Sequence, residues 1–272
     1  MQNIYIIILT SLLSISLFNG CAYSSSTKKG VVGVERKQLM LTSASDMNKG
    51  AQQAYSSILI KAQKDGTLNQ NKKNVQRIKI IAKKLILQTP TFRDDALGWK
   101  WEANLLTSKE LNAWCMPGGK IAFYSGIIDT LALTDDEIAA IMGHEIAHAL
   151  REHSRERSSQ SALANGGLVV SSALLGLDEG STSLASQVTS VAILLPNSRT
   201  QESEADYIGV ELAARAGYNP KAAINVWRKM KKISKGSPPE FLSTHPSHDT
   251  RIEELTAYTE VVYPLYQETL NK

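Results

Sequence analysis

The chain has 272 residues, a length that allows one or two domains. Hydrophobic residues make up 43% of it and charged residues 21%, which excludes a largely disordered chain and a polytopic membrane protein. Thirty Lys and Arg residues against 26 Asp and Glu residues leave a net charge of +4, too small and too dispersed to indicate nucleic-acid binding. Two cysteines exclude a disulfide-rich scaffold.

The chain begins with an uncharged apolar stretch at residues 4–18. A stretch of about 15 residues is short for a bilayer span of about 20 but suits the core of a signal peptide. Cys21 follows a small residue, an arrangement that resembles a bacterial lipobox, in which the cysteine becomes the lipidated first residue. We therefore predict a lipoprotein signal peptide over 1–20 and a lipid-anchored tether over 21–43. An uncleaved anchor helix and soluble secretion are the alternatives.

Lipid attachment at Cys21 leaves Cys115 as a free thiol, whereas a disulfide between the two cysteines excludes the lipid. Ala22 stands where lipoproteins retained in the inner membrane commonly carry Asp. By this resemblance the protein is expected in the bacterial cell envelope, on the outer membrane and facing the periplasm.

The remaining residues, 44–272, are predicted to form one α+β domain that is mainly α-helical and contains a small β-sheet. Caps and apolar spacing predict helices over 46–64, 74–88, 135–157, 201–216, 221–234 and from 250 onward. Alternating apolar and polar residues predict strands over 99–105, 113–116 and 120–125, the last with a free edge for an extended peptide. Residues 158–196, rich in Ser, Ala, Gly and Leu, are interpreted as a buried or loosely packed helix.

The helix predicted over 135–157 begins at a Thr-x-x-Glu capping box and carries the sequence HEIAH at residues 144–148. His144 and His148 lie one turn apart on one face, so their imidazoles can hold one metal ion. Glu145 lies beside this face, where its carboxylate can reach a water molecule on the metal. The alternative is an amphipathic helix with incidental histidines, which is disfavoured because the surrounding residues are apolar.

A catalytic zinc site needs a third protein ligand and an open position for water. Glu202 and Asp206 are four residues apart and share a helix face, so Glu202 is the candidate ligand and Asp206 the acceptor for a ligating histidine. Alternatively, both acids only stabilise the N-terminal end of their helix. Arg199 is a candidate for orienting substrate or pairing with Asp206, or for a simple surface ion pair.

The positions of two further histidines, His153 and His245, indicate their roles. On a continuous helix His153 lies about 140° from His148, which excludes it from the metal and favours a structural role. His245 precedes Pro246 in a loop that could fold back on the cleft. It is a candidate transition-state hydrogen-bond donor, a candidate fourth ligand that holds the enzyme latent, or a packed loop histidine.

Four segments together resemble the zinc metallopeptidase family that includes the CAAX prenyl protease and HtpX: HEIAH, QESEAD, NAWCMPGGKIAFYSGIID and FLSTHPSHDTRIEEL. The resemblance covers about residues 40–260. It implies a zincin-like fold with one zinc ion on His144, His148 and Glu202, Glu145 as general base, and Asp206 outside the ligands. It further implies a small envelope protease that degrades unfolded or misassembled outer-membrane proteins.

Two other functions stay open on the sequence. One is a non-proteolytic lipoprotein that uses the same domain as an assembly chaperone. The other is a structural zinc domain, in which four permanent protein ligands would close the metal site and Glu145 would be dispensable.

Overall fold

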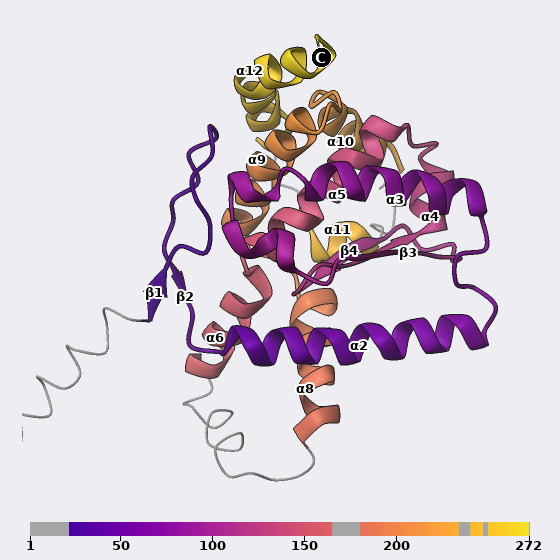
Figure 1. The fold of residues 1–272 in the computed structure, drawn as a ribbon, viewed down its shortest axis with the longest axis vertical. Helices are drawn as coiled ribbons and strands as arrows, with labels where there is room; N and C mark the ends of the chain where they lie inside the picture. The colour runs from indigo at the N-terminus through magenta and orange to yellow at the C-terminus, as the bar shows by residue number, and fades with distance from the viewer. Residues whose placement is uncertain (1–21, 165–179, 234–239, 247–249, 272) are drawn as a thin grey trace, which may run out of the picture.

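The fold is a set of helices around a three-stranded sheet, in a computed structural model that describes residues 22–164, 180–233, 240–246 and 250–271 (Figure 1). In chain order its elements are β1 (Tyr23–Ser24), β2 (Gln38–Leu39), α2 (Ala44–Lys64), α3 (Lys72–Ile86), η1 (Thr89–Thr91), η2 (Asp94–Gly98), β3 (Glu102–Leu106), β4 (Ala113–Met116), β5 (Lys120–Tyr124), α4 (Ser125–Thr130), α5 (Asp135–Leu150), α6 (His153–Ala164), α8 (Gly180–Thr189), η3 (Ser190–Leu194), α9 (Arg199–Arg215), α10 (Ala222–Ile233), α11 (Glu240–Thr244) and α12 (Arg251–Leu270). The predicted class, α+β and mainly helical, is confirmed.

Side-chain caps fix where several helices begin. Ser43 and Asn71 each accept a hydrogen bond from the backbone N–H three residues on, so α2 and α3 start two residues before the predicted positions. Thr134 and Glu137 form the predicted capping box at the start of α5. The helix predicted over 158–196 falls partly on residues outside the described ranges, and its described part belongs to α6, α8 and η3.

The sheet has the strand order β3-β5-β4. β5 pairs in parallel with β3, with Glu102 opposite Lys120, and antiparallel with β4, with Cys115 opposite Ile121. The prediction that the 120–125 strand offers a free edge is therefore wrong, because both of its edges are paired. The edges of this sheet are β3 and β4, and β4 packs against α5.

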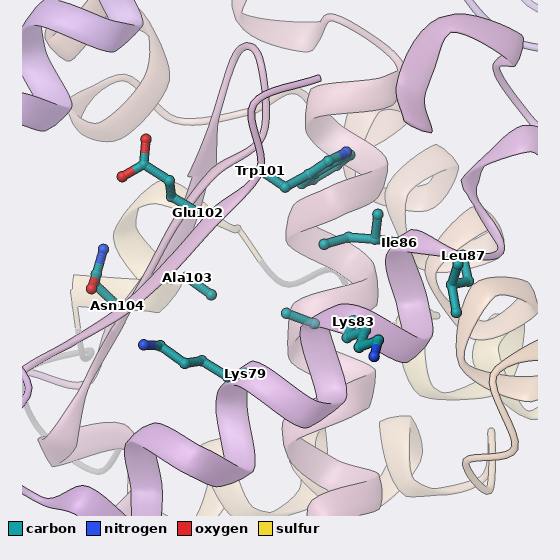
Figure 2. A pocket seen from close by; sticks show the side chains of 9 residues that line it. Lys79, Lys83, Ile86, Leu87, Trp101, Glu102, Ala103 and Asn104 are labelled. Carbon is teal, nitrogen blue, oxygen red and sulfur yellow. The ribbon is translucent and has the colours of Figure 1, made fainter. Parts of the chain in front are cut away.

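A groove borders the β3 edge, on the side of the sheet away from β4 (Figure 2). It is lined by Lys79, Ala82, Lys83, Ile86, Leu87, Trp101, Glu102, Ala103 and Asn104. These residues come from α3 and its C-terminal end and from β3 and the residue before it, so the groove is separate from α5 and α9.

Among the described helices, none is both long enough and apolar enough to cross a membrane.

The residues before α2 pack on the domain. Val32 and Val34 are buried in the main hydrophobic core. The backbone N–H groups of Val31 and Val32 donate to Glu211 Oε2 of α9 over 2.9 and 3.1 Å. The described part of the predicted tether, residues 22–43, therefore packs on the helices, because apolar burial and long-range hydrogen bonds fix it there.

The helix predicted over 135–157 is two helices. α5 ends at Leu150, and Glu152 adopts a left-handed backbone conformation with φ of 50°, so a new helix starts at His153. The continuous helix expected from the sequence is therefore wrong at this point. The break changes the direction of every side chain that follows it.

α5 and α9 touch backbone to backbone at two glycines. A Cβ added to Gly143 would lie 2.7 Å from the carbonyl oxygen of Gly209, and a Cβ added to Gly209 would lie 2.7 Å from the backbone nitrogen of His144. Only the absence of a side chain at both positions allows the helices to come this close. The two helices that carry the HEIAH and QESEAD sequences are thus held at the shortest possible separation.

We expect Gly209→Ala to lower the free energy of unfolding by about 1–3 kcal/mol, because the new methyl group overpacks this contact. Urea denaturation in the presence of a metal chelator measures the change. Gly98→Ala is the matched control, since its added Cβ meets nothing within 4 Å; we expect a change within about 0.5 kcal/mol. Equal stabilities for Gly209→Ala and the unmodified protein would contradict the close contact.

Candidate metal centre

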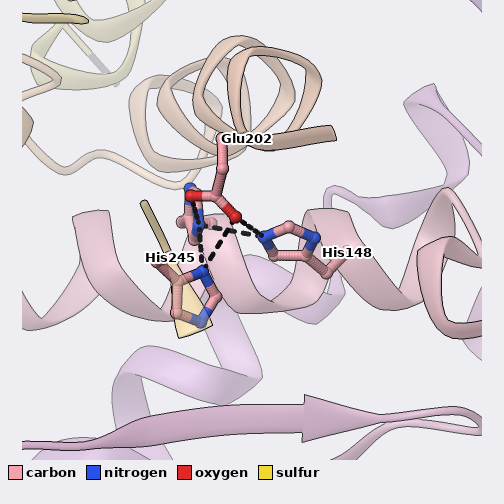
Figure 3. Close-up of side chains that lie close together, drawn as sticks. His148, Glu202 and His245 are labelled. Atoms are coloured by element: carbon pink, nitrogen blue, oxygen red, sulfur yellow. Dashed lines mark hydrogen bonds and ion pairs between the residues drawn. The ribbon is translucent and has the colours of Figure 1, made fainter. Parts of the chain in front are cut away.

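Four side chains from distant parts of the chain converge between α5, α9 and the loop after α11. His144 and His148 project from α5, Glu202 from the first turn of α9, and His245 follows α11. All four are buried. One nitrogen or oxygen atom of each lies within 4.8 Å of the others, and Figure 3 shows the side chains of His148, Glu202 and His245 pointing toward one another.

The separations within this cluster are those of a metal site. His144 Nε2 lies 3.0 Å from His148 Nε2 and 3.2 Å from His245 Nδ1. Glu202 Oε1 lies 3.3 Å from His148 Nε2 and 3.1 Å from His245 Nδ1, and its Oε2 lies 3.4 Å from His144 Nε2. Four ligand atoms in tetrahedral coordination at the usual zinc distances lie about 3.3 Å apart. The cluster therefore has the dimensions of one zinc site.

Two buried carboxylate oxygens support this fit. Oε1 of Glu145 and Oε2 of Glu202 accept no hydrogen bond from the described residues. Glu202 Oε2 lies 2.8 Å from Arg251 Nη1 and 3.4 Å from His144 Nε2, and Glu145 Oε1 lies 3.5 Å from His245 Nε2. Buried oxygens without hydrogen-bond donors are costly, whereas imidazoles and a carboxylate are ligands that zinc favours. The residues present therefore fit a zinc ion.

Asp206 of α9 and Arg251 of α12 hold the ligand side chains in position. Asp206 Oδ1 lies 2.9 Å from His144 Nδ1, the ring nitrogen that faces away from the cluster. Arg251 donates to both Asp206 oxygens over 2.7 and 2.8 Å. Its buried guanidinium lies 3.6 Å from the centroid of the Trp227 ring. This arrangement holds the His144 ring in place and offsets the negative charge of the two acids on α9.

Arg199 does not take the position considered for it. It is the exposed first residue of α9, about two turns before Asp206, and forms no ion pair among the described residues. Of the alternatives considered for Arg199, pairing with Asp206 is therefore excluded, because Arg251, 45 residues beyond Asp206, takes that place. Sequence reasoning missed Arg251 although it lies in the FLSTHPSHDTRIEEL segment, because no local pattern indicates its partner.

Burial and nearby charges set the protonation of the centre. Burial raises the pKa of Glu145. Burial also opposes ionisation of Glu202, but the positive charges of His245 and Arg251 outweigh it and hold the pKa of Glu202 well below its usual value. Burial lowers the pKa of His148 well below its usual value, which favours the neutral imidazole that a metal requires. The raised pKa of Glu145 suits a general base.

Of the two cysteines, only Cys115 lies in the described part of the chain, and it is not among the clustered ligand candidates. Cys115 is a buried free thiol on β4, outside the cluster, and burial raises its pKa well above the usual value. A buried neutral thiol is a poor nucleophile. Cys21, with its predicted lipid, lies outside the described residues.

These features coincide with a known protein family. Residues 72–259 match the family described as Peptidase family M48. The chain belongs to peptidase family M48. Its members are zinc metallopeptidases, so the resemblance drawn from the sequence is confirmed, as are the zinc cofactor and the assignment as a metalloendopeptidase.

Relatives of this M48 peptidase occur in mitochondria and in bacteria. It is 33% identical over 184 residues to the mitochondrial metalloendopeptidase OMA1 of Saccharomyces cerevisiae, covering 63% of this chain and 51% of the relative. It is 31% identical over 151 residues to the metalloprotease LoiP of Escherichia coli, covering 54% and 58%. It is 28% identical over 159 residues to the β-barrel assembly-enhancing protease of Yersinia pestis, covering 55% and 32%. The chain thus spans about half the length of the yeast relative.

Proposed function

We propose that this M48 peptidase is a zinc endopeptidase of the bacterial cell envelope that degrades misfolded or misassembled envelope and outer-membrane proteins. In this proposal His144, His148 and Glu202 hold the zinc ion and Glu145 is the catalytic base. The observation that carries it is the convergence of the ligand atoms beside a buried Glu145 carboxylate oxygen that accepts no hydrogen bond from the described residues.

Zinc, when bound, supplies Lewis acidity that polarises the scissile carbonyl and acidifies a water molecule. Glu145 accepts the proton of the attacking water and passes it to the leaving amine. Asp206 fixes the ring of His144 through Nδ1, and Arg251 fixes Asp206 in turn. The chain's own groups thus orient the ligands and carry the proton.

An extended substrate fits the edge strand β4 better than β5, whose edges are both paired. β4 packs on α5, the helix that carries Glu145. Main-chain pairing with an edge strand requires a segment whose own backbone hydrogen bonds are free. This requirement favours unfolded polypeptides over folded proteins, in keeping with a role in quality control.

His245 is proposed as a fourth ligand that keeps the enzyme latent. Its Nδ1 lies 3.1 Å from Glu202 Oε1 and its Nε2 lies 3.5 Å from Glu145 Oε1, so one imidazole lies between the ligand cluster and the proposed base. The Phe241 ring of α11 stacks on His245 with centroids 4.4 Å apart. Asn197 N–H and Nδ2 donate to the carbonyl oxygen of Thr244 over 3.0 and 3.3 Å, which holds α11 over the centre.

Four protein ligands are also the arrangement expected of a structural zinc site. Family membership favours the catalytic assignment. So does the buried carboxylate oxygen of Glu145, which accepts no hydrogen bond from the described residues, because a structural zinc site does not require a further acid beside its ligands. Substitution of Glu145 distinguishes a catalytic zinc site from a structural one. It also distinguishes a protease from a non-proteolytic chaperone.

The proposed location is the outer membrane, facing the periplasm, with a lipid on Cys21 as the anchor. Its support is the apolar stretch at residues 4–18, the small residue before Cys21, and the similarity to two bacterial proteases, one of which is named for enhancing β-barrel assembly. The proposed partners are unfolded polypeptide substrates and, through the lipid, the membrane.

We expect Glu145→Gln to retain zinc and to lose cleavage of casein or of an unfolded porin by about 10²–10⁴-fold, because the amide cannot accept the proton. Metal analysis and a cleavage assay measure the two effects. Glu137→Gln is the control, since it changes a buried acid of the same helix whose capping role glutamine can take over. Unchanged cleavage by Glu145→Gln would remove this residue from the mechanism.

We expect His245→Ala to raise the cleavage rate several-fold and to weaken zinc binding, because the substitution opens one coordination position and loses one ligand. Initial rates and chelator competition measure both. A fall in cleavage with unchanged zinc affinity would instead identify His245 as a transition-state donor.

We expect Cys21→Ala to release the protein from membranes, because the lipid attachment site is lost. Ala22→Asp should leave it membrane-bound but move it to the inner membrane. Fractionation of cells on a density gradient measures both. Sedimentation of Cys21→Ala with membranes would count against a lipid anchor.

A further inference from the structure

The break between α5 and α6 brings a fourth histidine next to the metal centre. His153, the first residue of α6, lies with its Nδ1 only 2.7 Å from Nδ1 of His148. Both rings are buried, and their centroids are 4.9 Å apart. On a continuous helix these side chains would point about 140° apart. The left-handed conformation of Glu152 therefore creates this contact.

The contact fixes where the protons lie. Nε2 of His148 faces the ligand cluster, 3.0 Å from His144 Nε2. In the proposed site the lone pair of this Nε2 would bind the metal, so the ring carries its proton on Nδ1. Nδ1 of His153 must then accept that proton's hydrogen bond, which places the proton of His153 on Nε2. That nitrogen lies 3.0 Å from Oε2 of Glu204, a carboxylate that can only accept. One arrangement of protons therefore satisfies both hydrogen bonds, from His148 to His153 and from His153 to Glu204.

Glu204 is held as an acceptor by two arginines. Arg151 donates to its Oε2 from Nε and Nη2 over 3.2 and 3.1 Å. Arg36 donates to Oε1 from Nε over 2.7 Å and to Oε2 from Nη2 over 3.1 Å. Bound by these donors and by His153, the Glu204 carboxylate has a fixed position and fixed hydrogen-bond directions.

We propose that His153 and Glu204 are positioning residues for the zinc ligand His148, fixing its ring orientation and its Nδ1–H tautomer. The inference rests on the proposed zinc site. Acids of α9 then position both histidine ligands of α5. Asp206 contacts His144 directly, and Glu204 acts on His148 through His153. α9 supplies one ligand and the supports of the other two.

The N-terminal segment takes part in this support. Arg36 lies just before β2, and Arg151 donates from Nη2 to the backbone carbonyl oxygen of Arg36 over 2.9 Å. Gln38 donates to the carbonyl oxygen of Arg151 over 2.6 Å. The stretch between the predicted anchor and the domain therefore helps to hold Glu204, and through it His148.

Four variants test the proposal on the purified full chain. His153→Leu removes the acceptor and should weaken zinc binding by about 10–100-fold, the usual effect of losing a partner of a ligating histidine. His153→Asn places a carbonyl oxygen near the position of Nδ1 and should recover most of the affinity. Glu204→Gln should weaken binding in the same direction as His153→Leu. Glu156→Gln is the matched control, because Glu156 is also buried and also binds Arg36, but among the described residues it forms no hydrogen bond with His153.

Zinc affinity is measured by competition with a chelator, and urea unfolding of the zinc-free forms gives their stability separately. The expected result is a loss of affinity in His153→Leu and Glu204→Gln that exceeds the loss in Glu156→Gln at equal zinc-free stability. Unchanged affinity in His153→Leu and Glu204→Gln, an equal loss in Glu156→Gln, or no recovery in His153→Asn would overturn the positioning role. Absence of zinc binding by the unmodified protein would instead overturn the proposed zinc site.

Discussion

The backbone contact of α5 with α9 at Gly143 and Gly209 is the constraint on which the metal centre depends. His144 follows one of these glycines directly, and Glu202 lies two turns before the other on α9. With the helices at this separation, a short carboxylate side chain reaches imidazoles on the facing helix. A side chain at either glycine would push the helices apart by more than the tolerance of a coordination sphere.

The second constraint is electrostatic. The centre buries two carboxylates of α9, Glu202 and Asp206, and burial alone would drive both toward their neutral forms. Arg251 counters this from α12 with ion pairs to both acids, and the stacking of its guanidinium on Trp227 holds it in place. Charges in the interior are thus paired across elements that are far apart in the sequence, so the centre and the helical packing depend on each other.

The same packing covers the centre. On one side, Phe241 N–H of α11 donates to the carbonyl oxygen of Leu111, two residues before β4, over 3.2 Å; on the other side, Asn197 N–H donates to the carbonyl oxygen of Thr244. Phe241 of α11 is also buried in the main hydrophobic core. The chemistry therefore lies on long helices fixed by the core, and a short helix packed on the same core covers it.

The sequence by itself determined the local chemistry. The spacing of HEIAH places His144 and His148 on one face wherever the helix lies, the capping box at Thr134 sets its start, and Glu202 and Asp206 share a face of α9 for the same reason. These relations depend only on the geometry of a helix. The family was recognisable because four such local segments occur together in one chain.

Only the tertiary structure decided which distant groups meet. Arg251, not Arg199, pairs with Asp206, β5 is the central strand, and the stretch over 22–43 packs on the domain. The helix break at Glu152 shows the reason most directly, since a non-glycine residue takes a left-handed conformation that no local preference favours. Buried hydrogen bonds of the residues around it stabilise that conformation. Contacts of this kind join residues tens of positions apart, so their energies enter only once the chain has packed.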